Sequence, residues 1–147
     1  MPKVLVIYYT QSGNTKRMAE SVAEGVQKAG LEAVVKDVSE VSPEELLKYE
    51  GIAIGSPTYY GSMAAPIKQL LDDSVKFHGK LDGKAGAAFS SSANIGGGNE
   101  TTVLDIVNAM LIHGMVIQGD WQGDHYGAVS IDAPDARASR QCIRMGD

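Results

Sequence analysis

The segment that most restricts the fold is a run of six apolar residues at positions 4–9, Val-Leu-Val-Ile-Tyr-Tyr. Because the run does not alternate with polar residues, both of its faces must be covered, as in a central parallel strand. From Thr15 the apolar residues recur at spacings of three and four until Gly30, which is typical of an amphipathic helix with a glycine at its end. We therefore expect a buried strand followed by a helix.

The rest of the chain repeats this alternation. We expect further strands at 31–38, 51–56, 84–91 and 115–118, and helices at 43–49, 64–77, 100–113 and 135–147. Five strands that alternate with helices predict an α/β fold with a parallel sheet, right-handed crossovers and helices on both faces. Ligands bind such open sheets at the carboxyl ends of the strands, so the loops of interest are 10–14, 57–62, 92–99 and 119–134.

Composition narrows the functional classes. The 147 residues fit one domain, and 44% hydrophobic against 21% charged residues exclude a disordered chain. A net charge of −5 argues against general affinity for nucleic acid or anionic membrane. One cysteine and three histidines predict neither a disulfide nor a metal cluster. We expect a cytoplasmic protein without membrane insertion, because the first apolar run is too short for a signal peptide or a span.

The loop after the first strand has the composition of a phosphate site. Residues 10–15 read Thr-Gln-Ser-Gly-Asn-Thr, which places three hydroxyls, an asparagine amide and a glycine at the start of a helix. Backbone N–H groups and the helix dipole attract phosphate there, and hydroxyls donate without a fixed charge. The alternative is that Ser12, Asn14 or Thr15 only caps the helix. The loop lacks the second glycine of a P-loop, and no Gly-x-Gly-x-x-Gly follows the strand, so neither ATP nor a Rossmann-bound dinucleotide is indicated.

With this loop the sequence resembles the flavodoxin family, whose phosphate loop reads Thr-x-Ser/Thr-Gly-x-Thr. The resemblance covers residues 3 to at least 126. Four further motifs are similar to the tryptophan-repressor-binding-protein type of quinone reductase: Ser-Pro-Thr-Tyr-Tyr-Gly at 56–61, Ser-Ser-Ser at 90–92 with Gly-Gly-Gly-Asn-Glu at 96–100, His-Gly-Met-Val at 113–116, and Tyr-Gly-Ala at 126–128. The family implies a single flavodoxin-like domain over 1–147, a three-layer sandwich with five parallel strands in the order 2-1-3-4-5.

The resemblance implies FMN as the cofactor. Its phosphate would lie on Thr10, Gln11, Ser12, Gly13, Asn14 and Thr15. Its isoalloxazine would lie between two loops, made of Pro57, Thr58, Tyr59, Tyr60 and Gly61 on one side and of Ser91, Ser92, Ala93, Asn94, Ile95, Gly96, Gly97 and Gly98 on the other. Adjacent tyrosines provide the aromatic face that such a ring needs, and glycines let the backbone approach it.

Two residues outside these loops complete the expected site. Tyr126 belongs to the last shared motif, and His113 matches a residue that reaches FMN in a neighbouring subunit of the quinone reductases. Plainer interpretations stay open. A tyrosine of the 57–61 loop can simply pack helix 64–77 on the sheet, the glycines of 96–98 can be a flexible connector, and His113 can interact with a helix dipole.

The function implied is electron transfer through bound FMN, with no catalytic acid, base or nucleophile from the protein. The first alternative is an NAD(P)H:quinone oxidoreductase that uses the same site, and the second is a cofactor-free interaction module. Partners would accordingly be redox proteins, or NAD(P)H and a quinone, and a homodimer or homotetramer stays open.

Departures from the subgroup weigh on this choice. Ser12 stands where the reductases carry a tyrosine that meets the nicotinamide nucleotide, and segments 38–50 and 74–79 are short where they carry longer ones. These features favour a protein that only carries electrons on FMN over a quinone reductase. Two features argue against an electron carrier: typical flavodoxins are much more acidic than the net charge of −5, and the sequence Ala-Asn-Ile at 93–95 stands where they place a tyrosine and resembles the reductases instead.

The carboxyl end of the chain is the last expectation. Cys142 should be a small buried apolar residue on the final helix. Family members continue that helix beyond the position of Asp147, so we expect a short final helix whose packing is affected.

Overall fold

The first strand lies at the centre of a parallel sheet, as its sequence predicts. The computed structural model describes residues 2–147. β1 (Lys3–Tyr8) pairs with β2 (Glu32–Asp37) on one side and with β3 (Gly51–Pro57) on the other. The side chains of Leu5, Val6 and Ile7 have no exposed surface. Double-sided burial of this segment is thereby confirmed.

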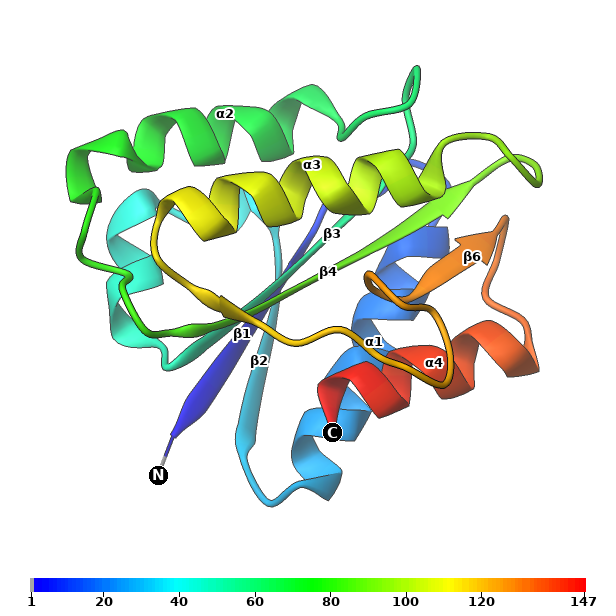
Figure 1. Ribbon diagram of the computed structural model, residues 1–147, viewed down its shortest axis with the longest axis horizontal. Coiled ribbons are helices and arrows are strands. Elements are labelled where there is room, and N and C mark those ends of the chain that lie inside the picture. Colours follow the sequence, from blue (N-terminus) through cyan, green and yellow to red (C-terminus); the bar gives the residue numbers. More distant parts are fainter. Residues whose placement is uncertain (1) are drawn as a thin grey trace.

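The complete sheet confirms the predicted strand order. Its path is β2-β1-β3-β4-β5, with β4 at Ala85–Ser92 and β5 at Val116–Ile117. Figure 1 shows α2 (Ala65–Asp73) and α3 (Asn99–Ile112) on one face, and α1 (Asn14–Lys28) and α4 (Ala136–Gly146) on the other. The three layers are those of a flavodoxin-like sandwich, and all parallel strands end at the same edge.

Alternation along β1 divides the core into two clusters. Leu5 and Ile7 face α2 and α3 in one cluster, whereas Val6 and Tyr8 face α1 and α4 in the other. Each cluster is filled by aliphatic side chains from the helices that cover it. The period-two pattern of the strand therefore decides which helix packs on which face.

The edge of the sheet differs from the prediction. The expected strand 115–118 is reduced to the two residues of β5, and the expected loop 119–134 contains a further strand, β6 (Val129–Ile131). β5 pairs with the beginning of β4, at Ala85 and Gly86, and β6 pairs with its end. The chain leaves the edge of β4 between these two strands and returns to it. We call the intervening segment, residues 118–128, the excursion.

Two predicted helices also take a different form. Segment 43–49 is a 3₁₀ helix (Pro43–Lys48), preceded by another 3₁₀ turn (Val38–Glu40). Segment 64–77 is α2 followed by a 3₁₀ helix (Ser74–Phe77). Both differences concern short pieces, in which the period of the hydrophobic pattern cannot separate 3.0 from 3.6 residues per turn.

The last helix packs against α1 through glycines. A Cβ atom on Gly25 would overlap the carbonyl oxygen of Ile143, and one on Gly146 would overlap that of Val22. The two backbones are therefore in direct contact. Cys142 lies beneath this contact with no exposed surface, as predicted, and burial raises the pKa of its thiol to about 12.

The glycine contact gives a prediction. Gly25→Ala should push α4 away from α1 and destabilise the protein by about 1–3 kcal/mol, because a methyl group must enter a filled space. Cys142 should then react faster with a thiol reagent such as DTNB under native conditions. Glu24→Ala is the matched control, since Glu24 is exposed on the same helix. Equal labelling rates in both variants would contradict this description of the contact.

Candidate functional site

The N-terminus of α1 is open at the carboxyl edge of the sheet. Gly13 occupies the cap position with φ of 94°, and no side chain caps the helix. The alternative in which Ser12, Asn14 or Thr15 acts as the cap is therefore wrong. Instead, the Thr10 hydroxyl accepts a hydrogen bond from the Gly13 N–H at 2.9 Å, which shapes the loop itself. The first-turn N–H groups of a helix have no acceptor within it, so they are directed to whatever occupies this edge.

The hydroxyls of the loop have different surroundings. Ser12 and Gln11 are exposed, and there is no acidic residue in the first turn of α1. Thr15 is buried, and its hydroxyl lies 3.1 Å from that of Ser91 at the end of β4. The exposed part of the loop can donate to an anion, whereas Thr15 ties the loop to the neighbouring strands.

The turn after β3 is tight and strained. Tyr59 and Ser62 exchange backbone hydrogen bonds of 2.9 and 3.1 Å around Tyr60 and Gly61. Both central residues have positive φ, 51° and 76°, which defines a type I′ turn. A left-handed conformation is rare for a bulky residue and costs about 1–3 kcal/mol. The Tyr60 side chain is fully exposed, so its own packing does not offset this cost.

The two adjacent tyrosines have different roles. The Tyr59 ring packs edge to face on Tyr9, with ring centroids 6.4 Å apart, and partial burial raises the pKa of its hydroxyl. Tyr59 therefore packs the turn against Tyr9, the residue that follows β1. Tyr60 projects into solvent and offers an aromatic surface to a flat ligand.

The loop after β4 approaches this turn closely. Residues 93–96 are exposed, and Gly98 begins α3 with φ of 102° and no side-chain cap. A Cβ atom on Gly98 would lie 2.8 Å from the Gly61 Cα, so only glycine allows this contact. The loop glycines are therefore more than a flexible connector. α3, like α1, begins uncapped at the carboxyl edge.

A buried hydroxyl network fixes the base of both loops. The Ser90 hydroxyl donates to the Ser56 carbonyl at 2.7 Å. Because a hydroxyl carries one proton, Ser90 must accept from Thr58, whose hydroxyl lies 3.0 Å away. Thr102 shares its proton between the Gly98 carbonyl at 2.9 Å and the Thr58 hydroxyl at 3.3 Å. The network is uncharged throughout.

Sequence reasoning missed Thr101 and Thr102, which join α3 to the turn after β3. A signal for them exists in the sequence. Two consecutive threonines, both poor helix formers, stand in the first turn of a helix directly after a glycine run. Such residues are expected to make local hydrogen bonds in place of helical ones.

His113 lies away from these loops. It ends α3, at the opposite end of the sheet, and is 8% exposed. Ser74 donates its proton to the Leu71 carbonyl at 2.6 Å, so the His113 Nε2–H must donate to the Ser74 hydroxyl at 2.8 Å. Within residues 2–147 nothing partners His113 Nδ1. Contact of this residue with a flavin of a neighbouring subunit stays a prediction, and it would require the buried ring to become accessible.

The surroundings of His113 predict a pH dependence. Burial, and then the charge of nearby His78, lower the pKa of the imidazole. In the unfolded chain this imidazole takes up a proton at about pH 6.5, whereas in the folded chain it does so only at lower pH. Its contribution to the free energy of unfolding is therefore fully present above about pH 6.5 and is lost as the pH falls. As the pH falls from 7.5 to 5.5, the free energy of unfolding of His113→Gln should therefore rise relative to that of the wild type. Parallel pH profiles from chemical denaturation would contradict this.

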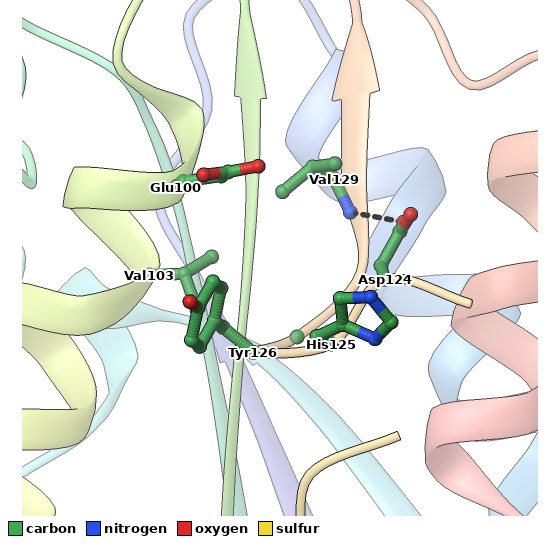
Figure 2. A pocket seen from close by; sticks show the side chains of 7 residues that line it. Glu100, Val103, Asp124, His125, Tyr126 and Val129 are labelled. Carbon is green, nitrogen blue, oxygen red and sulfur yellow. Dashed lines mark hydrogen bonds between the residues drawn. The ribbon is translucent and has the colours of Figure 1, made fainter. Parts of the chain in front are cut away.

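Tyr126 lies on the excursion, across a small pocket from α3. Figure 2 shows its ring beside Val103, with Glu100 above and His125 opposite.

The excursion is held in place by α4 and β6. Asp124 forms an ion pair with Arg137 and accepts a hydrogen bond from the Val129 N–H. Asp120 forms an ion pair with Arg144, and the hydrogen bond from Arg144 lowers the pKa of the Asp120 carboxyl to about 2. The structure thus brings Tyr126 to the first turn of α3, and its contact with FMN stays a prediction.

Two further findings concern residues 2–147. They contain no group of three or more histidine, cysteine, aspartate or glutamate side chains placed to hold a metal ion. In the same part of the chain, every helix is too short or too polar to cross a bilayer.

Comparison with known proteins agrees with this geometry. Residues 6–109 match the family model described as Flavodoxin. The chain is 41% identical over 155 residues to a protein of Aquifex aeolicus named flavodoxin, covering 99% of this chain and 84% of the relative. It is 40% identical to a protein of Sinorhizobium fredii named NAD(P)H dehydrogenase (quinone), covering 81% of this chain and 71% of the relative. The structure of a flavodoxin from the domain Archaea superposes with a TM-score of 0.81 at 31% identity, covering 98% of this chain and 93% of that one.

Proposed function

Because the chain belongs to the flavodoxin family, we propose that it binds FMN at the carboxyl edge of its sheet and transfers electrons through it. The observation that carries this proposal is the uncapped start of α1 beside the exposed Ser12 hydroxyl. A phosphate monoester needs several donors at one point, and backbone N–H groups with hydroxyls provide them without a buried charge. The absence of an acidic residue from the first turn of α1 also fits a dianion.

The other two loops fit the ring of FMN. The turn at Tyr60 and Gly61 offers an exposed aromatic side chain, and residues 93–96 of the other loop are exposed and can face the polar edge of the ring. When bound, FMN supplies one- or two-electron exchange. The protein's part is to hold the phosphate, to orient the ring through uncharged hydrogen bonds and to limit the access of water.

A second candidate function is that of an NAD(P)H:quinone oxidoreductase. A pocket of about 290 Å³ next to the site favours it, with Tyr9, Val41, Pro66 and Leu70 among its lining residues. Tyr9 contacts Tyr59, so a small ring in this pocket would lie near the turn. Asp37 and Asp73 also line the pocket, which disfavours a phosphate-bearing nucleotide there and is compatible with a neutral quinone.

One assay separates the two candidates from each other and from a cofactor-free interaction module. The purified protein is incubated with FMN, freed of unbound flavin, and mixed with NADPH and benzoquinone. Flavin absorbance without turnover is expected for a carrier, and rapid NADPH oxidation identifies the oxidoreductase. A colourless protein that takes up no FMN would refute the proposal and leave the interaction module.

The phosphate assignment has its own prediction. Ser12→Glu should weaken FMN binding by more than about tenfold, because a carboxylate would face the phosphate. Riboflavin, which lacks the phosphate, should lose much less affinity. Ser12→Gln is the matched control, since it has the same size without the charge. Equal FMN affinities of the Glu and Gln variants, measured by quenching of flavin fluorescence, would disprove the assignment.

A further inference from the structure

Two adjacent threonines in the first turn of α3, Thr101 and Thr102, connect this helix to the loop after β3 by hydrogen bonds. The Thr101 hydroxyl lies 2.6 Å from the Gly61 carbonyl oxygen and 2.9 Å from that of Gly98. The Thr102 hydroxyl reaches Gly98 and Thr58 from the buried side. Outside the helix, Thr101 reaches the Gly61 carbonyl and Thr102 reaches the Thr58 hydroxyl, and both hydroxyls also lie near the carbonyl of the cap residue Gly98. Neither side chain caps the helix. They connect the two loops that flank the proposed ring site.

The turn depends on such external support. Its central residue Tyr60 has positive φ and a side chain without contacts. The paired N–H groups of Tyr59 and Ser62 close the turn but do not select among turn types. The Thr101 hydroxyl carries one proton, and its shorter contact is the one with the Gly61 carbonyl. Donation there fixes the direction of the carbonyl that follows the strained residue. Gly98 packs against the same glycine, which brings α3 close enough for Thr101 to reach the turn.

We propose that Thr101 is a positioning residue that fixes the Tyr60–Gly61 turn and thereby sets the two one-electron midpoint potentials of bound FMN. This inference rests on the proposed function. With the Thr101 hydroxyl in place, the Gly61 carbonyl is engaged and points toward α3. Without it, the Gly61 carbonyl would be free to accept a hydrogen bond from bound FMN. If that bond were stronger after the first electron is taken up, the first potential would rise relative to the second.

The first experiment uses the apoprotein and needs no flavin. Amide hydrogen exchange is measured by NMR at Tyr59 and Ser62 in the wild type, in Thr101→Val and in Thr101→Ser. Valine keeps the shape of the side chain and removes the hydroxyl, whereas serine restores it. Exchange at both amides should be about threefold to tenfold faster in the valine variant and near wild type in the serine variant. Equal protection in wild type and valine variant would overturn the proposal. Thr101 is exposed, so folding of the variant is not at risk.

The second experiment measures the potentials of the FMN-loaded proteins by titration with dithionite. The separation between the two midpoint potentials should shift in Thr101→Val and stay at the wild-type value in Thr101→Ser. An unshifted separation in the valine variant overturns the proposal even if amide exchange is faster, because Thr101 would then be only structural. A wild-type protein that takes up no FMN refutes the proposed function as well, and the absent flavin spectrum identifies that outcome separately.

Discussion

The burial of β1 on both faces determines where the rest of the structure can place a ligand. A strand without a solvent face needs parallel neighbours, and parallel neighbours need crossover helices. The crossovers bring the carboxyl ends of β1, β3 and β4 to one edge of the sheet, together with the first turns of α1 and α3. Both helices begin at a left-handed glycine without a side-chain cap, so their free N–H groups meet at that edge.

The hydroxyl network at the base of the site is uncharged. Hydroxyls of Thr15, Thr58, Ser90 and Thr102 link the three loops, and each donates or accepts within the protein. Such a network keeps its geometry at any physiological pH, because none of its members titrates there. Tuning of the flavin would then depend on backbone carbonyls and on the side chains that hold them. Thr101 is the side chain best placed for that role.

The sequence predicted the features that depend on long patterns. The strand order and the double burial of β1 follow from runs or motifs of several residues, and the burial of Cys142 agrees with the usual behaviour of a free cysteine. It did not reveal β6, since three residues after a long polar segment give too little alternation to recognise. Thr101 was missed for another reason. Its partner Gly61 is 40 residues away in the sequence, and only the fold brings the two together.

If FMN binds at the carboxyl edge of the sheet, as we propose, it should change the amide chemical shifts of that edge. Titration of the ¹⁵N-labelled apoprotein with FMN measures these shifts residue by residue. Saturable shifts should gather at residues 11–15, 58–62 and 93–99, with the Gly13 and Asn14 amides moving in the direction of a stronger hydrogen bond. Shifts that instead gather around His113 at the opposite end of the sheet, or that fail to saturate, would show that FMN does not bind at the carboxyl edge.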